Sequence, residues 1–254
     1  MRNYVWVIII ILILLVAYII FRNNNNKNKN KKDTINHLYK YTELRDKLKT
    51  GDVLLFSCKK HDNLFGRLQY YIRTNLLGSE FGHVGIVIRD NDQIYLVECT
   101  DVCHTADNYA YRFNSYGKGG VRIIELDYLL DRYHKKYGGI FGVRFISKAI
   151  PNNTIFRKII KHKNKIFENK IKLFLVAFID NCLWHSLASN LSDIFYDQNR
   201  IICSQFAHEL LYNCDVVGPY NSNLFWPHLF DDNQIFDYIQ KISYTPIHKF
   251  TFDL

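Results

Sequence analysis

Apolar runs and helical repeats alternate along most of the chain. Residues 35–48 have the spacing of a short helix, and residues 52–56 form an apolar run after a glycine turn, which is typical of a strand. Residues 62–77 again have helical spacing, and Gly78 is placed to end that helix. Further strands are predicted at residues 83–88, 94–98, 121–126 and 142–146, and helical patterns dominate residues 153–212. Strands followed by helices predict an α+β fold, in which a small antiparallel sheet or barrel packs on helices.

Two of the predicted strands have the pattern of a hairpin, because the residues between them are rich in Asp and Asn. If Arg89 faces Ile94, the numbers of paired residues sum to 183 and Glu98 lies diagonal to His83. If the loop is two residues longer, the sum is 181 and His83 faces Glu98 directly. Both registers put the two side chains on one face within reach of each other. A register in which the numbers of paired residues add up to an even sum would instead place Cys99 opposite His83.

A histidine beside a carboxylate is a candidate general base, because the carboxylate fixes the tautomer of the ring and raises its pKa. His83 and Glu98 are such a pair in either register. Isolated pairs of this kind are more often structural and partly exposed. The pair alone therefore leaves both interpretations open.

A cysteine stands at the predicted start of a helix. Residues 203–212 have helical periodicity with one apolar face, which places Cys203 at or near the helix N-terminus. The helix dipole there favours a thiolate, and a nearby protonated histidine favours it further. The alternative is a buried structural cysteine, since free cysteines behave as small apolar side chains.

The N-terminus has the character of a membrane span. Residues 4–21 are an unbroken run of 18 apolar or aromatic residues, which would span about 27 Å as a helix. A cleavable signal peptide would have a shorter apolar region and a small-residue cleavage site, and this run ends in Phe21-Arg22. We therefore predict an anchor at 1–21, a flexible Asn/Lys-rich linker at 22–33 and one domain at 34–254. Under the signal-peptide alternative the body would be lumenal.

Basic residues are concentrated in two places. The net charge is +9, and residues 1–32 and 157–172 each contribute +6, which leaves −3 for the remainder. This distribution favours a membrane surface over nucleic acid as the partner. Five Lys or Arg follow the apolar run and only Arg2 precedes it, so the positive-inside rule favours a single-pass protein with a cytoplasmic body. Residues 157–179 are either a basic amphipathic helix lying on the membrane or a buried helix with a solvated basic approach.

The chain has Gly51-Asp52 before a strand, His83-Val84-Gly85 in the next strand and Glu98 at the end of the following one. Cys203-Ser204 comes about 120 residues after His83, at a helix start. These motifs, in this order, resemble those of the permuted papain-like cysteine hydrolases of the NlpC-type superfamily, in particular the YiiX/YaeF-like amidases and their poxviral relatives. The resemblance covers roughly residues 50–240, and it departs at about 151–200, a basic helical insertion. We expect the membrane to be a viral or host membrane.

The resemblance implies a catalytic set of Cys203, His83 and Glu98 acting on an amide or ester of an acyl or peptide substrate. The thiolate would attack the carbonyl, His83 would transfer the proton and Glu98 would orient the ring. A non-catalytic anchored binding module with the same fold is the alternative. The backbone N–H of Cys203 would be one oxyanion donor, and Gln198 is a loose candidate for a second.

The sequence predicts neither a cofactor nor a metal. It contains no Walker loop and no dinucleotide-binding glycine motif. Cys99, Cys103 and His104 have part of a zinc pattern but lack a second pair of ligands at suitable spacing. His208-Glu209 begins like a zincin helix but lacks the second histidine.

Overall fold

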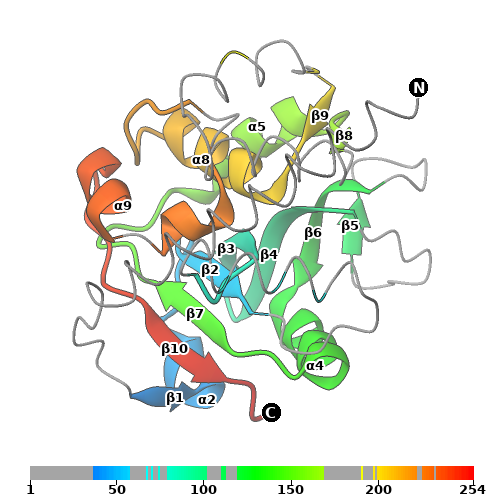
Figure 1. Cartoon of the computed structure of the whole chain (residues 1–254), viewed down its shortest axis with the longest axis vertical. Coiled ribbons are helices and arrows are strands. Elements are labelled where there is room, and N and C mark those ends of the chain that lie inside the picture. Colours follow the sequence, from blue (N-terminus) through cyan, green and yellow to red (C-terminus); the bar gives the residue numbers. More distant parts are fainter. Residues whose placement is uncertain are drawn as a thin grey trace, which may run out of the picture.

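The structure, a computed structural model, describes residues 37–57, 67, 70, 74, 79–101, 110–112, 119–168, 190, 197, 199–221, 225–231 and 233–254. These residues form an eight-stranded sheet in the order β1-β10-β7-β2-β3-β4-β6-β5 (Figure 1). Neighbouring strands are antiparallel except β1 and β10, which are parallel. The strands of the sheet are β1 (Leu38–Lys40), β2 (Val53–Phe56), β3 (His83–Asp90), β4 (Gln93–Thr100), β5 (Ala110–Arg112), β6 (Gly120–Glu125), β7 (Phe141–Arg144) and β10 (His248–Thr251).

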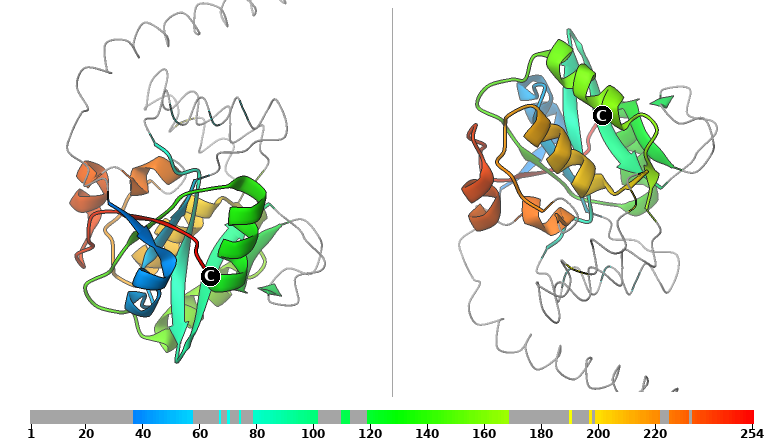
Figure 2. Two further views of the ribbon diagram at one scale, coloured as in Figure 1. Left: turned by 90° about the horizontal axis from the view of Figure 1, so that it is seen from below. Right: turned by 90° about the horizontal axis from the view of Figure 1, so that it is seen from above.

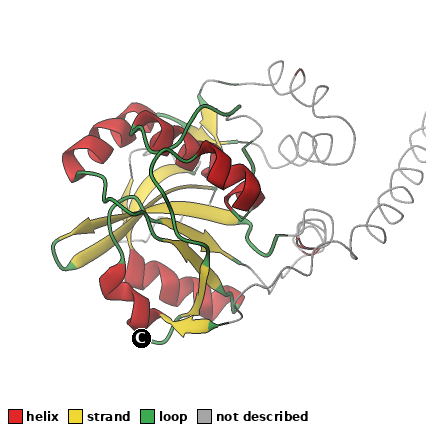
Figure 3. Cartoon of the chain, turned by 90° about the vertical axis from the view of Figure 1, so that its left-hand side faces the viewer, coloured by secondary structure: helices red, strands yellow, loops and turns green. Residues whose placement is uncertain are grey.

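Helices cover both faces of the sheet, as Figure 3 shows. The two views of Figure 2 place α2 (Tyr41–Leu44) and α4 (Leu126–Tyr137) on one side, and α5 (Asn152–Ile159) and α8 (Cys203–Asn213) on the other. Short 3₁₀ helices follow α2 and α5, namely η1 (Arg45–Lys47) and η3 (Ile160–His162). The remaining described elements are the pair β8 (Ile166–Phe167) and β9 (Arg200–Ile201), η5 (Pro227–Phe230) and α9 (Asn233–Ile239).

Two hydrophobic cores result from this layering, because successive residues of a strand point to opposite faces. On the α8 side, Val84 and Ile86 of β3 share a core with Phe206. On the α4 side, Val87 of β3 shares a core with Leu130. The predicted α+β class is confirmed, and the sheet is larger than the small sheet expected.

The differences from the sequence prediction have a common cause. Residues 38–40, expected within a helix, form β1 because they pair with β10, some 210 residues further along the chain. Residues 166–167, expected within a helical pattern, form β8 because they pair with β9 at residues 200–201, which the sequence predicts to be extended or transitional. These pairings are tertiary, and local periodicity carries no signal for them.

Several predicted segments lie outside the described residues. The predicted anchor and linker at 1–33 are among them, and so is most of the helix predicted at 62–77, where the described Arg67 and Tyr70 are helical. Within the part of the chain that the structure describes, no helix has both the length and the apolar character needed to cross a bilayer.

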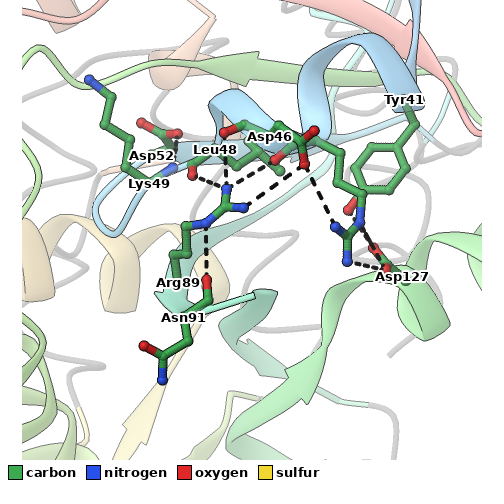
Figure 4. A network of polar contacts seen from close by, with 9 residues as sticks. Tyr41, Asp46, Leu48, Lys49, Asp52, Arg89, Asn91 and Asp127 are labelled. Carbon is green, nitrogen blue, oxygen red and sulfur yellow. Dashed lines mark hydrogen bonds and ion pairs between the residues drawn. The ribbon is translucent and has the colours of Figure 1, made fainter. Parts of the chain in front are cut away.

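The turn end of the hairpin is tied to the first helices by a network of polar contacts (Figure 4). Nη1 of Arg89 donates to the carbonyl oxygens of Arg45, Asp46 and Leu48, at 3.2, 3.1 and 2.8 Å. Asp52 accepts hydrogen bonds from the backbone N–H groups of Lys49 at 2.8 Å and of Ile146 at 2.7 Å. Asp52 therefore joins the turn before β2 to Ile146, two residues after the end of β7.

Candidate active site

The opposite end of the hairpin brings His83 and Glu98 together. Arg89 pairs with Ile94 and Gly85 with Glu98, so the paired numbers sum to 183, the first of the two predicted registers. Nε2 of His83 lies 2.5 Å from Oε2 of Glu98, across the diagonal. The His83 side chain is 15% exposed and that of Glu98 is 2% exposed. The pair is therefore largely buried rather than a solvated surface pair.

Gly85 is required by the packing of this hairpin. A Cβ atom at position 85 would lie 2.7 Å from Cδ2 of Leu96, closer than such atoms approach. Leu96 is fully buried and packs in the core on the α4 side. The glycine in the His83-Val84-Gly85 motif thus has a steric explanation.

Arg122 completes the cluster from a third strand. It stands directly opposite Glu98 in the β4–β6 pairing, so that Gly85, Glu98 and Arg122 form one row across three strands. Its Nε lies 2.7 Å and its Nη2 2.5 Å from Oε1 of Glu98, and its side chain is 8% exposed. Each oxygen of the Glu98 carboxylate therefore has its own partner, Arg122 on Oε1 and His83 on Oε2.

The charges of this cluster stabilise one another. Burial would raise the pKa of Glu98, but the neighbouring charges of Arg122 and His83 lower it well below the usual range. Burial would lower the pKa of His83, but Glu98 and Cys203 raise it to about 10. The cluster thus favours an ionised carboxylate and a protonated imidazole at neutral pH.

Cys203 is the first residue of α8. Ile202 before it is extended, with φ −104° and ψ 170°, and its N–H donates to Oε1 of Gln205 at 3.1 Å. The N–H groups of the first helical turn, to which Cys203 belongs, have no partner within the helix. The cysteine is 6% exposed.

The strand before Cys203 is held by two other segments. The carbonyl oxygen of Ile201 accepts hydrogen bonds from the backbone N–H of Glu168 at 3.2 Å and from Sγ of Cys99 at 3.5 Å. Residue 168 directly follows β8, and Cys99 lies in β4. The position of the helix start is therefore tied to the strand that carries Glu98.

Cys203 lies close enough to His83 to help raise the pKa of its imidazole. Because Nε2 of His83 is occupied by Glu98, Nδ1 is the nitrogen available to the thiol. The structure thus brings the three residues predicted from the sequence into one cluster. Arg122 is the member that the sequence analysis did not assign to the site.

Other candidates from the sequence do not join this cluster in the described residues. Gln198, Cys103 and His104 lie outside them. His208 is buried, stacks on Phe225 at 4.5 Å between ring centroids, and has its pKa lowered to about 4 by burial. Over the part of the chain that the structure describes, no group of three or more His, Cys, Asp or Glu side chains is arranged to hold a metal ion.

Fold and site together define a mixed α+β protein that places a cysteine at a helix start beside a histidine, a glutamate and an arginine. The chain is 44% identical over 225 residues to uncharacterized protein R372 of Acanthamoeba polyphaga mimivirus, which covers 88% of this chain and 90% of that protein. The chain therefore belongs to the same family as that mimivirus protein.

Two further comparisons add little to this assignment. No protein-family model matches the chain. The crystal structure of metalloprotein yiiX from Escherichia coli O157:H7 is similar over 65% of this chain and 66% of that chain, with 13% identity and a TM-score of 0.39. A similarity at this level does not establish a shared fold.

Proposed function

We propose that the chain is a membrane-anchored thiol hydrolase or acyltransferase that cleaves an amide or ester bond through Cys203, His83 and Glu98. The observation that supports it is the hydrogen bond between His83 and Glu98, with Cys203 at a helix start near enough to act on the pKa of His83. A nucleophile, a base within hydrogen-bond reach and a third group that orients the base are the features that define such a site.

The proposed reaction has two steps. The Cys203 thiolate attacks the carbonyl carbon, and the backbone N–H of Cys203, in the first turn of α8, would stabilise the oxyanion. Protonated His83 then gives its proton to the leaving amine or alcohol as that bond breaks, which leaves a thioester. In the second step His83 takes a proton from water or from another acceptor. The acceptor bonds to the acyl carbon, and Cys203 leaves as a thiolate.

The test is the rate of alkylation of Cys203 by iodoacetamide as a function of pH, measured by peptide mass spectrometry on the full chain. We expect fast alkylation well below the ordinary thiol pKa of about 8.5, and we expect His83→Ala to abolish it. Cys214 is an internal reference, because burial raises its pKa to about 11 and it should react slowly throughout. His134→Ala, at an exposed position of α4, is the matched control for removing an imidazole.

A non-catalytic module of the same fold predicts a different result. Cys203 would then react like Cys214 at every pH, and His83→Ala would change nothing. If the fast reaction is found, a second experiment distinguishes a hydrolase from a transferase. The acyl group is trapped on Cys203, and water or an amine or alcohol acceptor is then added.

Membrane attachment is the second part of the proposal. It rests on the apolar run at 4–21 and on the described face of α5 and η3. On that face Ile160 is 51% exposed and is flanked by exposed Arg157, Lys161 and Lys163. An exposed apolar residue among cations is the pattern of a helix that lies on an anionic lipid surface.

Hydrogen–deuterium exchange of the full chain in vesicles tests this contact. We expect residues 157–163 to exchange more slowly in vesicles that contain phosphatidylserine than in purely zwitterionic vesicles. Arg157→Glu with Lys161→Glu should remove the difference, whereas Lys135→Glu with Lys136→Glu on α4 should not. Equal exchange in both vesicles would favour the solvated alternative for this stretch.

Glycosylation at Asn152 or Asn190 in a eukaryotic host would contradict a cytoplasmic body.

A further inference from the structure

The contact between Arg122 and Glu98 is more than a strand-to-strand ion pair. Both guanidinium contacts, at 2.7 and 2.5 Å, fall on Oε1, which leaves Oε2 for His83. The arginine thus fixes which edge of the carboxylate faces the imidazole. Arg122 and Glu98 are both nearly buried, so water contributes little to screening their charges.

Among Cys203, His83, Glu98 and Arg122, the charges of the proposed reactive state sum to zero. A Cys203 thiolate and the Glu98 carboxylate are two anions, and His83 supplies one cation. Without Arg122 the cluster would carry a net charge of −1 away from water, which is costly. The cluster would then regain neutrality by taking up a proton, and the thiolate is the group that can accept one while His83 and Glu98 remain paired.

We propose that Arg122 is a positioning residue of this site, which holds Glu98 toward His83 and balances its charge so that Cys203 stays a thiolate beside protonated His83. The proposal rests on the proposed function, since it specifies how the same nucleophile is kept reactive. Arg122 acts through Glu98 in this scheme.

Other charged or titratable groups lie near the cluster and are unchanged in the variants below. Cys99 of β4 interacts electrostatically with Cys203 and Glu98, and also with Lys165 and Asp101. Lys165 is paired with Glu209 of α8 at 3.1 Å. A difference between variants at positions 98 and 122 therefore reports on the Glu98–Arg122 pair.

The experiment measures the alkylation rate of Cys203 against pH in the full chain for wild type, Arg122→Lys, Arg122→Gln, Glu98→Gln and the double glutamine variant. We expect Arg122→Gln to move the pH of half-maximal rate upward by about one unit or more, which is about a tenfold slower reaction at a fixed lower pH. The pH of half-maximal rate in Arg122→Lys should stay closer to that of the wild type. Glu98→Gln should not move the midpoint upward, because it removes an anion.

The double variant gives the decisive comparison. If charge balance operates, adding Glu98→Gln to Arg122→Gln returns the midpoint toward wild type. A merely structural role predicts that two damaging substitutions act in the same direction. Arg157→Gln on exposed α5 is the control for removing a guanidinium, and near-ultraviolet circular dichroism checks that each variant is folded.

Each result supports or overturns the proposal. A folded Arg122→Gln variant with the wild-type profile would overturn it, and so would a double variant no better than Arg122→Gln alone. If Arg122→Gln does not fold, the double variant and Arg122→Lys carry the same comparison. A wild-type protein without fast alkylation at low pH would refute the proposed function itself, whereas a fast wild type with insensitive variants would refute only the role of Arg122.

Discussion

Replacement of Glu98 by glutamine should change how the stability of the fold depends on pH. Glutamine has nearly the shape of glutamate, so the substitution removes the charge while the side chain keeps its place beside His83 and Arg122. In the wild type, burial would lower the pKa of His83, but Glu98 and then Cys203 raise it from 6.5 to about 10. A group whose pKa is raised on folding stabilises the fold fully at pH values below its pKa in the unfolded state. That stabilisation is lost as the pH rises through the pKa of the group in the folded state.

The size of the effect follows from that shift. A rise from 6.5 to about 10 corresponds to about 5 kcal/mol at the usual conversion of about 1.4 kcal/mol per unit. Cys203 supplies part of it, and coupled buried groups share their protons. We therefore expect that the free energy of unfolding of the wild type loses about 2–4 kcal/mol more than that of Glu98→Gln between pH 6.5 and pH 10.5.

Urea unfolding of both proteins at several pH values measures this difference. Lysines, tyrosines and other cysteines titrate in the same range, but they are common to both proteins and cancel in the comparison. Glu98→Gln also removes the Glu98 charge that faces Arg122. The stability cost of that loss is the same at every pH in this range. A stability gap between the two proteins that is the same at pH 6.5 and pH 10.5 would refute the reasoning. His83→Gln should flatten the profile in the same way as Glu98→Gln.

Three further predictions concern residues that shape the fold around the site. Gly85→Ala should lower the thermal midpoint through a loss of about 1–3 kcal/mol by overpacking, and adding Leu96→Ala should cost less than the two single changes summed; strict additivity would contradict the steric account. Asp52 has its pKa raised by burial to about 7, against the backbone hydrogen bonds that it accepts. Its stabilisation is therefore present below about pH 4 and lost as the pH rises through 7, so Asp52→Asn should flatten the urea-unfolding profile in that window, and an unchanged profile would refute this. Arg89→Ala should cost about 1–3 kcal/mol in urea unfolding, because it removes the donor from three carbonyl groups, and a loss near zero would show that water replaces the guanidinium.

The site could be predicted as far as its residues are local in sequence. A short turn between two strands leaves two registers for the hairpin, and both place His83 and Glu98 on one face, so this part of the site could be predicted from the sequence. The helix start at Cys203 follows from the periodicity of the residues after it. In each case the signal extends over only a few residues of chain.

Arg122 could not be assigned in this way. It is opposite Glu98 only because β6 pairs with β4 in one register, and the segment between the two strands gives no turn signal that fixes that register. The alternation of Val121, Arg122 and Ile123 in a predicted strand is the one available hint, since a charged residue between apolar neighbours faces either water or a buried partner. The contact of Cys203 with His83 is likewise tertiary, and only the resemblance to a known family suggested it.

The pairing of β1 with β10 has a consequence for synthesis of the chain on the ribosome. β1 is made among the first residues of the described domain, and its hydrogen-bonding partner at residues 248–251 is made some 210 residues later. The side chain of Asp253 also accepts hydrogen bonds from the N–H and hydroxyl of Thr42, at 3.0 and 2.8 Å. While translation is under way, β1 has no partner and β7 lacks its β10 neighbour, although domains generally fold from the N-terminus as they emerge. The edge of this sheet is therefore completed only after translation has passed residue 251, and a chain that stalls earlier leaves strand edges exposed to other nascent chains.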